Sequence, residues 1–231
     1  MKNLHTFNLF INESEEGTFS FEELSPEAQD HAIGENQEIN VDYEGWEDGV
    51  TEGFKEDMEE IGISDIDISY TGFWSQGDGA SFTSNSIDTR KLFNAAGIKS
   101  TDALDMEVEN RDDKDKEFYD LLDTLEDIGQ LDRTRIKPED IRVTIERGSS
   151  NYSHENTISV NIEIWDEPDG WKEPYDFVTN LEREMNIFVR KKCKELYSAL
   201  EKEYEFLTSD EAVKETLIDN DYQFDEEGNQ V

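Results

Sequence analysis

The side chains best suited to chemistry lie in one glycine-rich stretch and at one distant histidine. Residues 72–82 read Gly-Phe-Trp-Ser-Gln-Gly-Asp-Gly-Ala-Ser-Phe, with three glycines within eight residues. Glycine permits positive φ angles and close approach of a partner, so this stretch could be a rigid polar loop that contacts a ligand or another protein. The side chains of this candidate ligand loop are Trp74, Ser75, Gln76, Asp78 and His154.

The same stretch also has a structural interpretation. An Asp-Gly pair favours the turn of a β-hairpin, so Asp78-Gly79 could join two strands with Phe73 and Phe82 packed below. A phosphate-binding loop is excluded, because no Lys-Ser/Thr follows the last glycine and Asp78 would bring negative charge to the anion. His154 could act as a general base, although a single histidine in a turn is more often an exposed polar residue. The sequence leaves the ligand loop and the structural hairpin both open, and it favours a protein that is not an enzyme.

A second group of candidate residues consists of acids on one predicted helix. Apolar residues recur every three or four positions from Trp46 to Ile61, which predicts an amphipathic helix over Glu47–Ile61. Acids three and four residues apart are neighbours on the opposite face, where their mutual repulsion makes sense if a cationic partner relieves it. The candidate partner-binding residues are Glu47, Asp48, Glu52, Glu56, Asp57, Glu59 and Glu60.

The charge of the chain restricts its partners. Among 231 residues, 59 Asp and Glu stand against 21 Lys and Arg, a net charge of −38. Direct binding of nucleic acid or of an anionic membrane is therefore excluded, since both need a basic surface. Residues 1–72 hold 20 acids but only Lys2 and Lys55 as bases, so their net charge is 2 − 20 = −18. The strongest basic island is Arg190, Lys191, Lys192 and Lys194.

Three interpretations of the acidity compete. Solubility alone asks for a charge of magnitude roughly 2–8 in a small domain, far less than this chain carries. Adaptation to high salt would spread acids uniformly, whereas residues 173–203 hold seven acids and six bases. The third interpretation, a negative surface shaped for a basic protein such as the DNA groove of a nuclease or repressor, is the one we favour. The basic island could pair with the acidic N-terminal half, within one chain or in a homodimer.

The elements that must position these residues read as a mixture of helices and hairpins. Alternating apolar residues predict strands, periodic ones predict helices, and Ser25-Pro26 opens a helix through about residue 33. Further strands are predicted at 4–11, 66–70, 80–83, 141–145 and 158–164, and further helices at 88–96, 115–128, 175–207 and from Ser209 onward.

This arrangement predicts an α+β fold: a small antiparallel sheet built from hairpins and packed by several helices, one of them a long C-terminal helix. We expect a single acidic domain over residues 1–231, in which 225–231 form a flexible tail.

Cys193 is the only cysteine, which excludes an internal disulfide, and its apolar neighbours on the helix place it in the core. No cofactor and no metal site are expected, because the acids after Asp219 lack the glycine and the final acid of a calcium loop. No stretch has the length of a signal peptide or a membrane span, so we expect a cytoplasmic protein.

Several blocks of the chain resemble a group of acidic proteins encoded by bacteriophages that carry a GFWSQGDGASF-type motif. These blocks are residues 21–29, 72–82, 151–154, 200–212 and 220–225. The resemblance implies a viral accessory protein in the cytoplasm of the infected bacterium, and it brings no catalytic assignment. It favours an inhibitor that binds a basic, nucleic-acid-binding surface of a host or anti-phage defence protein, in the manner of a DNA mimic. A small-molecule or nucleotide-binding protein, or a small enzyme, that uses residues 72–82 is the alternative, and a virion component is a third.

Overall fold

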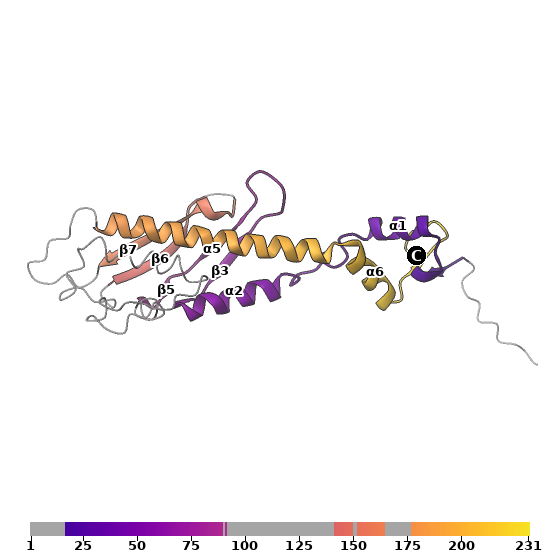
Figure 1. Ribbon diagram of the computed structural model, residues 1–231, viewed down its shortest axis with the longest axis horizontal. Helices are drawn as coiled ribbons and strands as arrows, with labels where there is room; N and C mark the ends of the chain where they lie inside the picture. Colours follow the sequence, from indigo (N-terminus) through magenta and orange to yellow (C-terminus); the bar gives the residue numbers. More distant parts are fainter. Residues whose placement is uncertain (1–16, 90, 92–140, 150–151, 165–176) are drawn as a thin grey trace, which may run out of the picture. The chain divides into compact units, whose positions relative to one another are not determined.

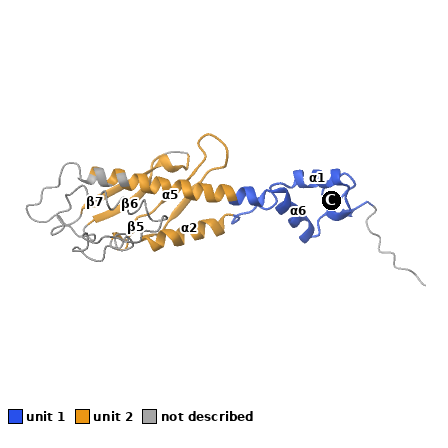
Figure 2. Cartoon of the chain, in the orientation of Figure 1, with its two compact units in different colours: residues 1–46, 203–231 blue, residues 47–202 orange. Residues whose placement is uncertain are grey.

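The computed structural model describes residues 17–89, 91, 141–149, 152–164 and 177–231. The chain divides into two compact units, unit 1 from residues 1–46 and 203–231 and unit 2 from residues 47–202 (Figure 2). The prediction of a single domain stays a prediction, because a division into compact units does not tell whether each one folds alone. The strand predicted at 4–11, the helix at 115–128 and most of the helix at 88–96 lie outside the described residues.

Unit 1 brings together two segments from opposite parts of the sequence. The first contributes β1 (Phe19–Ser20), the 3-10 turn η1 (Phe21–Glu23) and α1 (Pro26–Glu35), and the second contributes α6 (Asp210–Asp219) and β8 (Gln223–Phe224). β1 and β8 pair antiparallel, with Phe19 opposite Phe224. The core of the unit is formed by Phe21, Leu24, Ala28, Ala32, Val213, Leu217 and Phe224.

Both helices of unit 1 begin as the sequence predicts. The Ser25 hydroxyl accepts a hydrogen bond from the Ala28 N–H at 3.2 Å, and Pro26 occupies the first helical position of α1. The Ser209 hydroxyl accepts from the Ala212 N–H at 3.3 Å at the start of α6. These caps satisfy N–H groups that a helix leaves unpaired at its start.

Residues 225–231, which we expected to form a flexible tail, form a hydrogen-bonded turn. Asp225 Oδ1 accepts the backbone N–H groups of Glu227 and Asn229, at 3.0 and 2.9 Å. Gly228 has a φ of +90°, and a Cβ atom there would lie 2.2 Å from the Ala28 carbonyl oxygen. The Val231 N–H then donates to the Gln223 carbonyl at 3.0 Å. The turn is ordered by this carboxylate and by packing against α1, which composition alone does not reveal.

The described residues of unit 2 form two hairpins and two helices. The first hairpin joins β3 (Asp67–Tyr70) to β4 (Ala80–Thr83), and the second joins β6 (Ile141–Arg147) to β7 (Ile158–Ile164). Ser84 and Ile145 exchange backbone hydrogen bonds of 3.1 and 2.8 Å, which connect the two hairpins. The short strands β2 (Ile63–Ser64) and β5 (Ser86–Ile87) also pair antiparallel. The other elements among the described residues are α2 (Asp48–Glu60), the 3-10 turn η4 (Glu155–Thr157) and α5 (Phe177–Leu207), whose last residues belong to unit 1.

The core of unit 2 follows from the alternation along β6 and β7. Their inward residues are buried while the residues between them are more exposed, as expected for a sheet with one covered face. α5 runs along these strands and packs Met185, Phe188, Val189 and Cys193 onto them, and Met58 of α2 joins the same core (Figure 1). The predicted α+β class, with a long C-terminal helix, is confirmed.

Candidate functional site

The β3–β4 loop, residues 71–79, is closed and turned by local hydrogen bonds. The Thr71 N–H donates to the Gly79 carbonyl at 3.0 Å, and the Asp78 N–H donates to the Ser75 carbonyl at 3.1 Å. Asp78 Oδ2 accepts the Ser75 N–H at 2.7 Å, and Gly77 has a φ of +98°. A hairpin is therefore present, but its turn lies at 75–78 rather than at Asp78-Gly79.

Two glycines of the loop are explained by how closely it approaches residues 152–154. A Cβ atom on Gly79 would lie 2.4 Å from the Cβ of His154, and one on Gly77 would lie 3.1 Å from the ring of Tyr152. No other residue fits at Gly79 without moving the backbone of the neighbouring segment. The structure thus brings His154 to the loop, as the sequence predicts for the candidate site.

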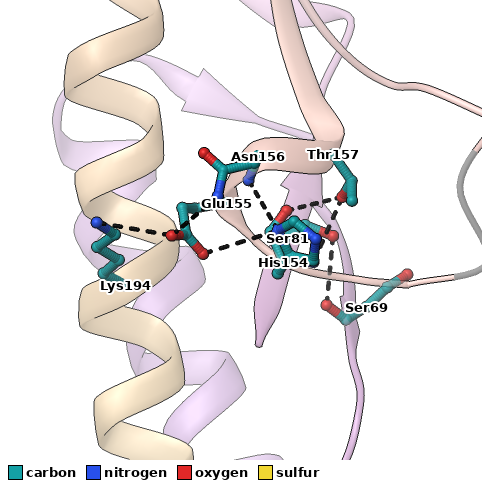
Figure 3. A network of polar contacts seen from close by, with 7 residues as sticks. All are labelled: Ser69, Ser81, His154, Glu155, Asn156, Thr157 and Lys194. Atoms are coloured by element: carbon teal, nitrogen blue, oxygen red, sulfur yellow. Dashed lines mark hydrogen bonds and ion pairs between the residues drawn. The ribbon is translucent and has the colours of Figure 1, made fainter. Parts of the chain in front are cut away.

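The polar atoms of His154 and of Asp78 in the loop make local hydrogen bonds. His154 Nδ1 accepts the Asn156 N–H at 3.1 Å and lies 3.9 Å from Glu155 Oε2, and the other Glu155 oxygen, Oε1, lies 3.6 Å from Lys194 Nζ (Figure 3). Asp78 Oδ2 accepts a hydrogen bond from the Ser75 N–H. A general base needs a free acceptor within reach of its substrate. These contacts make Asp78 Oδ2 and His154 Nδ1 caps of local turns.

The tip of the loop presents an exposed indole. Ser75 and Gln76 are exposed, and the Trp74 side chain is 64% exposed with its backbone at a φ of +66°. A non-glycine residue in this region costs roughly 1–2 kcal/mol. The surrounding contacts must therefore hold it there.

Those contacts are made by aromatic rings that pack around Phe73, next to Trp74. The Phe73 ring lies 6.5 Å from the ring of Tyr70, 5.7 Å from that of Tyr197 and 5.8 Å from that of Trp74. Tyr197, on α5, also has a hydrogen bond from the backbone of Trp74. We call Tyr70, Phe73, Trp74, Tyr197 and the neighbouring Tyr152 the aromatic surface.

The acids predicted to bind a partner on α2 are not equivalent. Asp48, Glu52, Glu56, Asp57, Glu59 and Glu60 are exposed, and Glu52 forms an ion pair with Lys55 at 3.0 Å. Glu47 is half-buried instead and is hydrogen-bonded to the side chain of Tyr70. Burial, together with this carboxylate, raises the pKa of Tyr70 to about 12. Glu47 therefore binds Tyr70 of the aromatic surface, whereas the other six acids are accessible to a partner.

The most acidic part of the described chain is unit 1. Its described residues hold 18 acids and, as their only Lys or Arg, Lys214, a net charge of 1 − 18 = −17. The described residues of unit 2 hold 18 acids and 10 bases, a net charge of 10 − 18 = −8. Sixteen acids among the described residues of unit 1 are exposed, and we call them the acidic surface of unit 1. They are Glu22, Glu23, Glu27, Asp30, Glu35, Glu38, Asp42, Glu44, Glu205, Asp210, Glu211, Glu215, Asp219, Asp221, Glu226 and Glu227.

Sequence reasoning missed this surface because half of it lies at the other end of the chain. Segments 17–46 and 203–231 are each acidic, and only the pairing of β1 with β8 and the shared core unite them. The signal available in the sequence was the absence of Lys and Arg from residues 17–46.

Three of the four cations of the basic island form ion pairs within unit 2. Lys192 and Lys191 pair with Glu195 at 2.8 and 3.8 Å, and Lys194 pairs with Glu155 at 3.6 Å. These pairs are local to unit 2. Cys193, within the island, is fully buried in the core, and this burial raises the pKa of its thiol to about 12.

Two further expectations concern metals and membranes. Across residues 17–89, 91, 141–149, 152–164 and 177–231, no three His, Cys, Asp or Glu side chains lie together as metal ligands would. Within the same residues no helix combines the length and the apolar character of a membrane span.

Comparison with known proteins gives one match. A family model described as a domain of unknown function, DUF8835, matches residues 46–210. No curated protein and no solved structure matches the chain. The matched region contains all of unit 2 and leaves most of unit 1 outside.

Proposed function

The chain belongs to the DUF8835 family, a domain of unknown function that here spans unit 2, and we propose that it is a binding protein whose acidic unit 1 engages a basic protein surface. The observation that carries this proposal is the charge of unit 1. Its described residues include 18 acids, 16 of them exposed, with Lys214 as their only Lys or Arg.

Few of these acids are needed to build the unit. Glu23 accepts from the Ser20 N–H at 2.9 Å, Asp225 holds the C-terminal turn, and Glu38 accepts from the Tyr204 hydroxyl at 3.4 Å. Most of the others have no role in a cap or turn. Acids packed this densely repel one another, so a cationic partner would relieve a cost that folding alone leaves in place.

The chemistry of the surface favours a partner that itself binds nucleic acid. Duplex DNA carries about one charge per 1.7 Å of axis, and proteins that bind it present a matching array of Lys and Arg. A dense array of carboxylates competes for that same array. Complementary charge of this kind speeds association and makes binding strongly dependent on salt.

We therefore propose inhibition of a host or anti-phage defence protein by occupation of its nucleic-acid site. The resemblance of residues 21–29, 72–82, 151–154, 200–212 and 220–225 to phage-encoded acidic proteins supports this setting, which is the cytoplasm of an infected bacterium.

The experiment compares two variants with the same change in charge. In the first, Glu27, Glu35, Glu211 and Glu215 of unit 1 become Gln. In the second, Glu56, Glu59 and Glu60 of α2 become Gln and Asp57 becomes Asn. All eight side chains are exposed, so both variants should fold.

Each protein is used to capture partners from bacterial lysate at low and high salt. We expect the wild type and the α2 variant to recover a DNA- or RNA-binding protein at low salt, and the unit 1 variant to lose it. Recovery of no such protein by the wild type would refute the proposal. Loss in the α2 variant alone would move the binding surface to α2.

The alternative of a nucleotide site, small-molecule site or small enzyme at residues 72–82 has less support. Asp78 Oδ2 and His154 Nδ1 each accept a backbone N–H group, and Gly77 and Gly79 are explained by packing. The exposed side chain of Trp74 is the feature of the loop that its own packing does not explain.

A further inference from the structure

We propose that the aromatic surface around Trp74 binds an arginine side chain of the protein partner, by stacking of the guanidinium on the indole. The inference rests on the proposed function, because it assumes a basic partner, and it names a second point of contact in unit 2. Nothing in the match to the family assigns a role to this loop.

The first argument is that Trp74 is exposed and yet held. The residue is 64% exposed, whereas a tryptophan used for packing would be mostly buried. Its backbone is fixed by the closed loop, by a hydrogen bond to Tyr197 and by Phe73 beneath it. A side chain that is already ordered loses little entropy on binding, which is a property of residues that dominate interfaces.

The second argument is that negative charge surrounds these rings. Burial raises the pKa of Tyr197, and Glu201 and then Asp78 raise it further. Burial and then Glu47 raise the pKa of Tyr70, so each of these carboxylates lies close enough to act on a phenol. Asp78 and Glu201 have no ion pair with any Lys or Arg in the described part of the chain. The field at the aromatic surface therefore favours a cation.

A second exposed ring borders the same turn. Tyr152 is 56% exposed, and its ring lies against Gly77, the residue that reverses the loop. Trp74 belongs to the β3–β4 loop, and Tyr152, from a distant segment of the chain, lies against the turn of that loop. A cation over an aromatic face is attracted by the ring quadrupole, most strongly over tryptophan.

Arginine fits this surface better than lysine does. The guanidinium is planar, stacks on an indole and is less strongly hydrated than an ammonium group. Its remaining N–H groups can donate to a carboxylate such as Asp78 while the plane stays on the ring. Lysine offers only a hydrated point charge, and a neutral planar group offers the shape without the charge.

The test uses an N-acetylated, C-amidated tetra-arginine peptide as the probe. The full chain is labelled with ¹⁵N, and the indole N–H signal of Trp74 is assigned by its loss in Trp74→Phe. Tetra-citrulline, which keeps the planar shape without the charge, and tetra-lysine serve as controls. The titration is done near physiological ionic strength, where the Debye length is about 8 Å and long-range attraction is screened.

We expect the Trp74 indole signal to shift with arginine more than with lysine, and little with citrulline. Trp74→Leu, which keeps an apolar side chain without a ring, should weaken binding at this site about two- to fivefold. Ser75→Ala, at an exposed neighbour, should leave it unchanged. An unshifted Trp74 signal, or equal affinity in Trp74→Leu, would overturn the inference.

The outcomes separate the two proposals. If arginine shifts only signals of unit 1 and a nucleic-acid-binding protein is still captured, the inference fails and the proposed function stands. If Trp74 responds to arginine but no such protein is captured, the proposed function fails and the arginine site stands.

Discussion

Gly79 of the β3–β4 loop lies directly against His154, so that a Cβ atom on the glycine would be 2.4 Å from the histidine Cβ and 2.8 Å from its Cα. Neither of those atoms can swing aside as the end of a long side chain could. This one contact joins the two sequence segments that carry the candidate site.

Gly79→Ala should therefore destabilise the protein by about 1–3 kcal/mol, the usual cost of forcing extra atoms into a packed site. The measurement is urea unfolding followed by circular dichroism. Gly53→Ala is the matched control, because Gly53 lies inside α2 with no heavy atom within 4 Å of its added Cβ. There the substitution should stabilise by about 0.5–1 kcal/mol. An unchanged stability of Gly79→Ala would show that residues 152–154 do not hold the loop.

Gly228 provides the corresponding test of unit 1. Alanine there would need a φ near +90° and would meet the Ala28 carbonyl oxygen at 2.2 Å. We expect Gly228→Ala to detach the C-terminal turn, which would raise the hydrogen-exchange rate of the Val231 N–H that donates to Gln223. Gly34→Ala, at an open position of α1, is the control. Fast exchange of Val231 already in the wild type would contradict the structured turn.

The periodic and capped elements were predictable because their causes are local. The apolar spacing of four along α2, the hydroxyl caps Ser25 and Ser209 and the alternation along β6 and β7 act within a few residues. The structure places α2 and α5 within two residues of the predicted bounds.

What sequence reasoning missed depends on long-range contacts. Nothing near Phe19 indicates that it pairs with Phe224, yet this pairing creates the acidic surface of unit 1. Nothing in the sequence near Glu47 indicates that its carboxylate is hydrogen-bonded to the side chain of Tyr70. The C-terminal turn had a local signal, an aspartate followed three residues later by glycine, which the strong acidity of the segment obscured.

Tyr70 gives a prediction for alkaline pH. Its pKa is raised from 10.0 to about 12, chiefly by burial and then by Glu47. A group whose pKa is raised on folding contributes stability that is complete below its unfolded pKa and is lost as pH rises through its folded one. The wild type should therefore lose more thermal stability than Tyr70→Phe does between about pH 10 and 12. Tyr43→Phe, at an exposed tyrosine of unit 1, should follow the wild type. Parallel curves for Tyr70→Phe and the wild type would contradict the raised pKa of Tyr70.

Cys193 tests the packing of α5 on the sheet. Its side chain is fully buried, and burial raises the pKa of the thiol to about 12. The thiolate is the reactive form, so labelling by a maleimide at neutral pH should be slow and should follow the rate at which α5 opens. Denaturant should make labelling fast. Rapid labelling of the folded protein would place Cys193 outside the core.

The central claim is that unit 1 competes with nucleic acid for a basic protein surface, and displacement of DNA measures this most directly. A fluorescent duplex is bound to the protein captured from lysate, and its anisotropy is followed as the chain is added. We predict release of the duplex by the wild type and by the α2 variant, and weaker release by the variant that neutralises Glu27, Glu35, Glu211 and Glu215. A duplex that stays bound at saturating wild-type chain would contradict the claim.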